Sequence, residues 1–244
     1  MADDELDDEE EPDRAHPRWE APAPGAPGAP SSPPSEATCR AWVERHLNLL
    51  EPTTRDRIAL LFCKTGFNPE FFVRQVELHQ NRYRLLLDHV QQPTTRCPHA
   101  GADVIVMAHG TSIEGLCGIL RDRAVRSKDW RSGGAGNHGI YGRATTTAGI
   151  TDTIRVVRSI TEHNKNMTDV ILEMRARAVH CSVGSGGIKQ EAEMCRKGYV
   201  TSYQGEGRWC MPEELAAMWS LWVNGNAALS SCECKMFLGD RGSP

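Results

Sequence analysis

Apolar residues recur at helical spacing between residues 37 and 90 of the chain. Two sets fall near a period of 3.6 residues, the first being Trp42, Val43, Leu47 and Leu50 and the second Phe72, Val76, Leu78, Leu85 and Leu86. Asn68-Pro69-Glu70 is typical of a helix N-cap and first turn. The pattern predicts helices from Ala37 to about Val90, followed by a proline-containing connector over 91–101.

The pattern changes after Gly101, where short apolar runs replace the helical spacing. Asp103–Ala108 is predicted as a buried strand that stops at His109-Gly110-Thr111-Ser112, and the spacing within Ile113–Asp122 predicts a helix directly after it. Further along, we expect a helix over 152–160 and strands over 170–180, 199–203, 208–211 and 219–223. Short strands with interspersed helices predict an α+β body.

The N-terminal segment differs from the rest of the chain in composition. Residues 1–36 carry 11 acidic and 2 basic side chains and 8 of the 14 prolines, so the remaining residues have a net charge of +5 although the whole chain has −4. Like charges repel and proline–glycine runs bury little apolar surface, so this segment is predicted to be disordered. It would serve as an interaction arm, as a shield over a basic site or as a solubilising leader, and we favour the leader.

Composition also argues against several classes of protein. No window approaches 18 consecutive apolar residues, so no membrane-spanning helix is expected, and the acidic N-terminus is unlike a secretory signal. The nine scattered cysteines favour reduced thiols in a cytoplasmic or nuclear protein over a disulfide scaffold. The compact Cys/His pairs lack the spacing of a zinc knuckle, so no metal is expected.

Three short motifs carry the residues best suited to chemistry. His109 stands where a strand gives way to a helix and could hold a ligand hydroxyl, while Gly110 lets a ligand approach the backbone. Tyr141 follows glycines that predict a flexible loop over 133–139, and its ring could stack on a flat heteroaromatic group. Glu206, between two glycines, could bind a sugar hydroxyl and stabilise a developing positive charge. Each also has a structural interpretation: a strand-end histidine bonded to a carbonyl, a core tyrosine and a solvated loop glutamate.

In their order and spacing these motifs resemble the catalytic signature of the poly(ADP-ribose) polymerase superfamily of ADP-ribosyltransferases. The matching elements are His109-Gly110-Thr111, the helical pair Ile119-Leu120, Gly139-Ile140-Tyr141, and Glu206 seven residues before the glutamate of Pro212-Glu213. The resemblance extends over residues 105–223. It implies a split-sheet α+β catalytic body over 101–225, with flanking helices. The disordered tail 1–36 and a helical lead-in 37–100 would precede this body, and a C-terminal extension 226–244 would follow it.

The resemblance also implies an activity. The protein would cleave NAD+ and transfer ADP-ribose to a protein or nucleic-acid acceptor, a protein being favoured. His109 would hold a ribose hydroxyl of NAD+, the Gly110 backbone would clamp the nicotinamide amide, and Tyr141 would stack on the nicotinamide ring. Glu206 would bind the nicotinamide-ribose 2′-hydroxyl and stabilise the cationic transition state. The remaining residues of the implied NAD+ site are Thr111, Gly139 and Thr147.

Two alternatives stay open beside this interpretation. RNA 2′-phosphotransferases resemble the chain in their strand-end His-Gly-Thr and rely on arginines and a second histidine, for which the candidates are His138, Arg126, Arg131 and Arg143. The other alternative is a degenerate member of the superfamily that binds ADP-ribose-like ligands or a protein without catalysis. It is suggested by the second aromatic of the family, which is missing from residues 150–154.

Overall fold

The computed structural model describes residues 32–80, 82–88, 90–111, 113–126, 139–145, 150–163, 170–203 and 207–224. Within these ranges the chain forms a nine-stranded sheet in the order β1-β2-β9-β5-β3-β4-β8-β7-β6. The described strand pairs are antiparallel except β6 and β7, which are parallel. Helices pack around this mixed sheet, so the predicted α+β class is confirmed.

Three helices precede the sheet, as the apolar spacing predicts for this part of the chain. They are α1 (Glu36–His46), α2 (Pro52–Thr65) and α3 (Pro69–Phe72). The Ser35 hydroxyl accepts a hydrogen bond from the Thr38 N–H at the start of α1. The side chain of Asn68 caps α3 in the same way, which confirms the predicted cap, although that helix has only four residues.

The helical prediction is wrong over residues 73–90, where the chain forms the antiparallel strands β1 (Val73–His79) and β2 (Arg82–Leu87). β2 also pairs with β9, so it has a neighbouring strand at each edge. The consecutive residues Leu85, Leu86 and Leu87 are all buried, so both faces of β2 are covered here. A continuous apolar run of this kind fits a central strand as well as a buried helix, and pairing with distant strands decides between them.

The rest of the described chain alternates strands and helices. Its elements are β3 (Asp103–Thr111), α4 (Ile113–Asp122), β4 (Gly139–Ala144), α5 (Ile150–His163), β5 (Val170–Ala178), β6 (His180–Val183), α6 (Gly187–Arg196), β7 (Val200–Tyr203), β8 (Arg208–Pro212), the 3-10 turn η1 (Glu213–Leu215) and β9 (Ala217–Asn224). The predicted strands β5, β7, β8 and β9 and the helices α4 and α5 are confirmed. The predicted strand β3 is also present, but the prediction that it stops at His109 is wrong, because His109, Gly110 and Thr111 continue to pair with β5. β4, β6 and α6 were not predicted as elements. No helix within the described ranges is long and apolar enough to cross a membrane.

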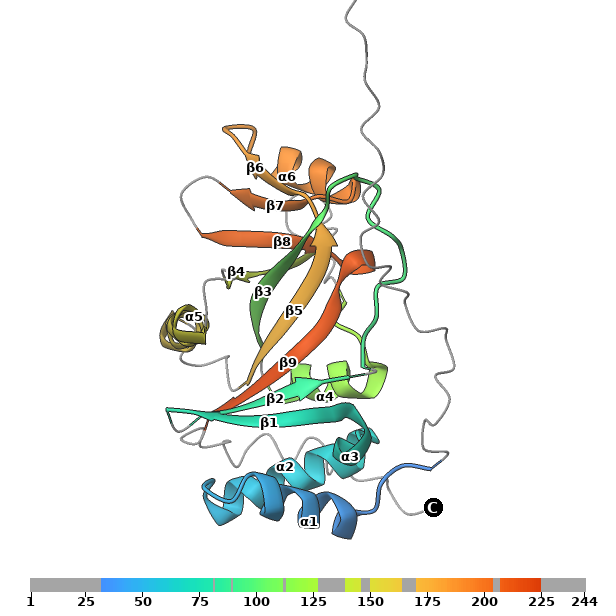
Figure 1. The fold of residues 1–244 in the computed structure, drawn as a ribbon, viewed down its shortest axis with the longest axis vertical. Helices are drawn as coiled ribbons and strands as arrows, with labels where there is room; N and C mark the ends of the chain where they lie inside the picture. The colour runs from blue at the N-terminus through green and yellow to red at the C-terminus, as the bar shows by residue number, and fades with distance from the viewer. Residues whose placement is uncertain are drawn as a thin grey trace, which may run out of the picture.

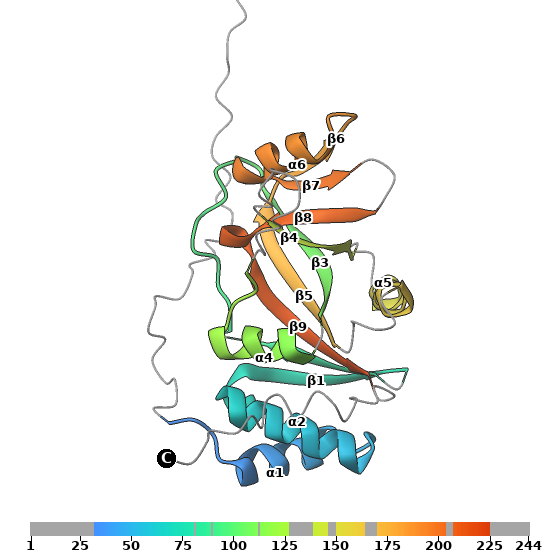
Figure 2. The same ribbon diagram turned by 180° about the vertical axis from the view of Figure 1, so that it is seen from behind.

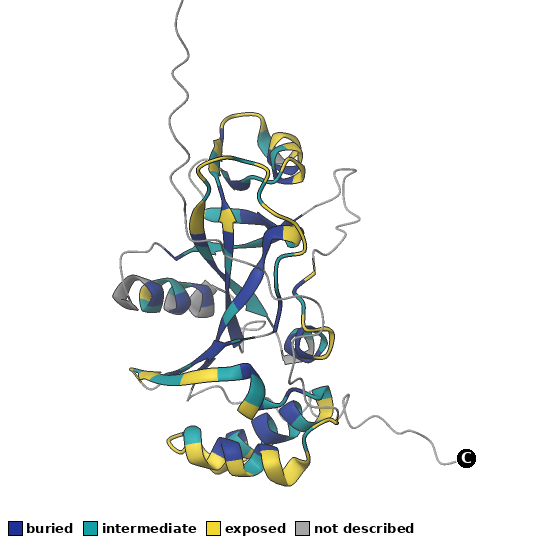
Figure 3. Ribbon diagram, turned by 45° about the vertical axis from the view of Figure 1, so that its right-hand side comes forward, coloured by how far each residue is buried: buried dark blue, intermediate teal, exposed yellow. Residues whose placement is uncertain are grey.

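The strands of the sheet do not all run in one direction. In Figure 1, β3, β5 and β9 run steeply through the middle, while β4, β8 and β7 lie across their upper end. The same figure shows α1, α2 and α3 below β1, and α6 beside β7. Figure 2, from behind, brings α4 to the front of the sheet, and Figure 3 shows α4 and α5 on opposite sides of the central strands.

One large buried cluster joins the N-terminal helices to the sheet. It includes Trp42 of α1, Phe62 of α2, Leu85 of β2, Leu172 of β5 and Met211 of β8. A smaller cluster under α5 contains Ala108, Val157, Ile160, Ile171 and Trp222. The predicted lead-in 37–100 therefore shares both its core and its sheet with the predicted catalytic body.

Two deletions of the N-terminal segment should have different effects. Removing residues 1–31 is expected to leave the melting temperature nearly unchanged, because the segment has no apolar face that could pack. Removing residues 1–36 also removes the capping hydroxyl of Ser35, which is worth about 1 kcal/mol, or roughly 2–4 °C in a chain of this size. Calorimetry of both variants checks this. A drop of many degrees for the shorter deletion would mean that the acidic segment packs onto the body.

Candidate functional site

Strands β3 and β4 are neighbours for only part of their length. Their described pairing covers Met107–Ala108 of β3 and Arg143–Ala144 of β4. Beyond this point His109–Thr111 continue to pair with β5, while Gly139–Gly142 pair with β8. The two strands therefore part at the sequence positions where the His-Gly-Thr and Gly-Ile-Tyr motifs lie, and Figure 1 shows β4 lying across the direction of β3.

Close packing explains the two glycines of β4. A Cβ atom on Gly142 would lie 2.9 Å from Cγ of Met107 and would also strike the carbonyl oxygen of Ala108 on β3. A Cβ atom on Gly139 would lie 2.7 Å from Sγ of Cys195. Any side chain at either position would push its neighbours away. The glycines of this motif thus have a packing role whether or not they also contact a ligand.

The His109 side chain is held by a backbone carbonyl of β4. Its Nδ1 lies 2.6 Å from the carbonyl oxygen of Tyr141, and because a carbonyl can only accept, Nδ1 carries the proton and donates it. Burial lowers the pKa of His109, and this hydrogen bond only partly offsets the effect, so the ring is neutral at neutral pH. Nε2 is then an acceptor. The structural interpretation of His109, a strand-end histidine that is hydrogen-bonded to a carbonyl, is therefore met by Nδ1. The other ring nitrogen, Nε2, is not used by this bond.

Tyr141 is anchored at its hydroxyl end. The hydroxyl donates to Oε2 of Glu191 on α6 over 3.3 Å, and Cζ of Arg208 lies 5.0 Å from the ring centroid. Burial raises the pKa of Tyr141, and its neighbours Cys210 and Glu191 raise it further. The hydroxyl therefore stays protonated and able to donate. The ring has a fixed position, with a cation against it.

A buried polar cluster that the sequence motifs did not reveal lies beside Tyr141. The side chain of Glu191 is 0% exposed, and its Oε2 lies 3.7 Å from Nη2 of Arg208 on β8. Cys195, one turn further along α6, has its Sγ 3.4 Å from Sγ of Cys210. That thiol–thiol contact, together with burial, raises the pKa of Cys195. With no exposed surface, Glu191 supports Tyr141 and does not itself face a ligand.

The helix that carries this cluster has a detectable pattern in sequence. Glu191 and Cys195 are four residues apart and so share a face of α6 with each other. Ala192 and Cys195 are buried, while Glu193 points to solvent and pairs with Lys197. This spacing could have identified the amphipathic helix. It could not have shown that the buried glutamate meets Tyr141, fifty residues earlier in the chain.

The remaining predicted site residues are partly described. Gly110 and Thr111 lie in the part of β3 that has left β4, opposite Ile171 and Val170 of β5. Glu206 and Thr147 lie outside the described residues, as does the predicted flexible loop apart from Gly139. The structure thus brings His109 and Tyr141 together and contains no information on Glu206.

The residues of the phosphotransferase alternative are spread over several elements. Nη1 of Arg143 donates to the Ser159 hydroxyl of α5 over 3.2 Å. Arg126 lies 3.9 Å from the Asp122 carboxylate at the end of α4. Arg131 and His138 lie outside the described ranges. Each of the two described arginines therefore has a side-chain partner within the chain.

The described part of the chain contains no group of three or more His, Cys, Asp or Glu side chains that could hold a metal ion. The cysteines in it, seven in number, are free thiols. In comparisons with known proteins, no family model, no curated protein and no solved structure matches this chain.

Proposed function

We propose that this chain is an NAD+-dependent ADP-ribosyltransferase that transfers ADP-ribose to a macromolecular acceptor. The observation that supports it best is His109: a neutral ring with Nδ1 bonded to the Tyr141 carbonyl at the point where β3 and β4 part. This arrangement joins the first two elements of the resemblance in space, although 32 residues separate them in the chain. A fixed acceptor nitrogen at such a position suits a ligand hydroxyl.

Binding of NAD+ would use groups on both parted strands. Nε2 of His109 would accept a hydrogen bond from a ribose hydroxyl, because Nδ1 already holds the ring proton. The backbone of Gly110, which carries no side chain, would pair with the nicotinamide amide. The Tyr141 ring, held by Glu191, would stack on the nicotinamide. The anchoring reduces the entropy that Tyr141 loses on binding.

Cleavage would depend on a carboxylate that Glu206 supplies. As the bond between the ribose C1′ and nicotinamide breaks, its electron pair leaves with nicotinamide, and C1′ becomes cationic. A fixed carboxylate that binds the 2′-hydroxyl stabilises this state more than the neutral ribose of the ground state. An acceptor nucleophile then forms the new bond to C1′ and loses its proton. Glu206 precedes Gly207 and strand β8, which pairs with β4 at Tyr141.

A non-catalytic ligand-binding module is the second candidate. The observation in its favour is that Tyr141 is built into the packing, with its hydroxyl on the buried Glu191 and Arg208 against its ring. The Tyr141 side chain therefore has a structural role even without a ligand. Binding without turnover would distinguish this candidate from the enzyme.

Replacing Tyr141 with alanine should weaken NAD+ binding. Stacking of a base on an aromatic ring is worth about 1–3 kcal/mol, which is an upper guide for the loss. Tyr141→Phe is the matched control, because it keeps the ring and removes only the hydroxyl group, which donates to Glu191. Titration calorimetry should show NAD+ binding retained by the phenylalanine variant and reduced by the alanine variant. Equal dissociation constants for wild type and Tyr141→Ala would show that the nicotinamide does not stack there.

A further inference from the structure

A second cluster lies on the sheet away from the point where β3 and β4 part. Cζ of Arg175 on β5 lies 3.9 Å from the ring centroid of Trp219 on β9, and Cζ of Arg74 on β1 lies 5.0 Å from the same ring. These three residues, here the arginine–tryptophan cluster, come from three strands of one sheet. None of them has a role in the proposed NAD+ site.

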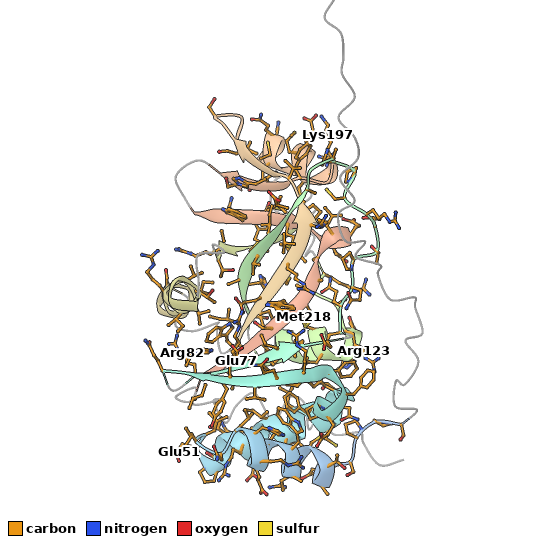
Figure 4. The ribbon with its side chains drawn as sticks, in the orientation of Figure 1. Glu51, Glu77, Arg82, Arg123, Lys197 and Met218 are labelled. Atoms are coloured by element: carbon orange, nitrogen blue, oxygen red, sulfur yellow. The ribbon has the colours of Figure 1, made fainter. Side chains whose placement is uncertain are left out.

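Two members of the cluster, Arg74 and Trp219, lie at irregularities in the strand register. The pairing of β1 with β2 shifts between Val73 and Gln75, which makes Arg74 an extra residue. The pairing of β5 with β9 steps from Ser220 to Met218, which makes Trp219 an extra residue as well. Met218 is labelled in the middle of the sheet in Figure 4. A β-bulge re-aims a side chain, and bulges are over-represented beside functional sites.

The cluster carries more positive than negative charge. Asp88 lies 3.8 Å from Nη1 of Arg74, and its charge acts on Arg175 as well. Burial lowers the pKa of Arg175, and the like charge of Arg74 lowers it further. Arg177 is exposed and, two residues along β5, lies on the same face as Arg175. Arg74, Arg175 and Arg177 place three guanidinium groups on this part of the sheet, and such a concentration of positive charge favours an anionic ligand.

The surroundings of these arginines favour a phosphodiester over a simple carboxylate. A guanidinium matches the geometry of phosphate oxygens and binds them in pairs. Trp219 is half-buried, and Val104, opposite Arg177, is 48% exposed, so apolar surface lies among the charges. Single-stranded nucleic acid offers both phosphates for the arginines and flat bases for the apolar surface.

We propose that the arginine–tryptophan cluster, with Arg177 and Val104, binds the phosphodiester backbone of a single-stranded nucleic acid. The proposal does not depend on NAD+ chemistry. Arg175 lies opposite Val106 on β3, three residues before His109, and because alternate residues of a strand point to opposite faces, Arg175 and His109 lie on opposite faces of the sheet. The proposed nucleic-acid surface is therefore separate from the proposed NAD+ site.

Binding of a fluorescently labelled oligouridine to the full chain at low salt tests the proposal. Fluorescence anisotropy should show saturable binding, with Arg74→Ala and Arg175→Ala each roughly tenfold weaker. Each substitution should also lower the slope of log affinity against log salt by about one. Arg121→Ala is the matched control, because Arg121 is an exposed arginine on α4 and lies on none of the strands that carry the cluster. Its affinity should equal that of wild type.

Arg175→Lys separates a binding role from a folding role. It keeps the charge but loses the planar fork, so its affinity should fall between those of wild type and Arg175→Ala at an unchanged melting temperature. Three results would each overturn the proposal. They are an absence of oligouridine binding, an equal loss in Arg121→Ala, and displacement of oligouridine by polyglutamate at the same charge concentration, which would indicate an acidic-peptide site. None of these results bears on NAD+ cleavage.

Discussion

Replacing Glu206 with glutamine should slow nicotinamide release from NAD+ by roughly 100-fold or more, in line with the loss of one preorganised electrostatic group. Loss of nicotinamide makes the ribose carbon cationic, so the missing charge matters most in the transition state. Glutamine has nearly the same size and can still accept a hydrogen bond from the ribose hydroxyl. The NAD+ dissociation constant should therefore change far less than the rate.

Glu213 provides the control for Glu206 within the same segment. It begins the turn η1 after β8, and its backbone carbonyl accepts a hydrogen bond from the Ala216 N–H. Glu213→Gln leaves that backbone bond intact and should release nicotinamide at the wild-type rate. Equal rates for wild type and Glu206→Gln would rule out the transferase mechanism, and the ligand-binding module would become the better explanation.

Replacing Arg84 with leucine should lower the free energy of unfolding by about 3–5 kcal/mol, because it leaves a buried charge without its partner. The Glu173 side chain is 1% exposed, and Nε and Nη2 of Arg84 each lie 2.8 Å from its Oε2. Nε1 of Trp222 donates to the same oxygen over 2.9 Å, and the Ser220 hydroxyl also donates to it. Arg84 further reaches Glu77, which Figure 4 labels, over 3.4 Å.

Two variants isolate the buried charge as the cause. Combining Arg84→Leu with Glu173→Gln removes the charge but keeps an acceptor for Trp222 and Ser220, so it should recover much of the lost stability. Arg40→Leu removes an arginine that pairs with Glu36 on the surface and should cost at most about 1 kcal/mol. Denaturant titration measures all three. An Arg84→Leu variant no less stable than Arg40→Leu would contradict the account of this ion pair.

The elements that the sequence predicted well are those with one unambiguous period. The alternation in the second half of β5 and the helical spacing of α4 each fit a single structure. The helical prediction was wrong at β2 because a strand that is covered on both faces has consecutive buried leucines, and a buried helix can have the same run. β4 was missed because Gly139 and Gly142 weaken its strand pattern, and the reason for both glycines lies in the thiol of Cys195 and in strand β3.

The sequence motifs pointed to His109 and Tyr141, whereas the buried Glu191 beside them could not be predicted from any motif. His109 and Tyr141 were predicted to act together from motif order, and the structure joins them by a hydrogen bond. Glu191 had no such signal, because a glutamate on an amphipathic helix is usually solvent-exposed. Its burial depends on meeting Tyr141 and Arg208, which come from two other elements. Glu206 lies outside the described residues and remains a prediction.

Nicotinamide release by the full wild-type chain, supplied with NAD+ alone, tests most directly whether this chain cleaves NAD+. Water or the chain itself then serves as the acceptor. A transferase should release nicotinamide in proportion to protein, at a rate that saturates with NAD+. If calorimetry shows that the folded chain binds NAD+ while no nicotinamide forms, the chain is a binding module; if it neither binds nor cleaves NAD+, the proposed site is wrong.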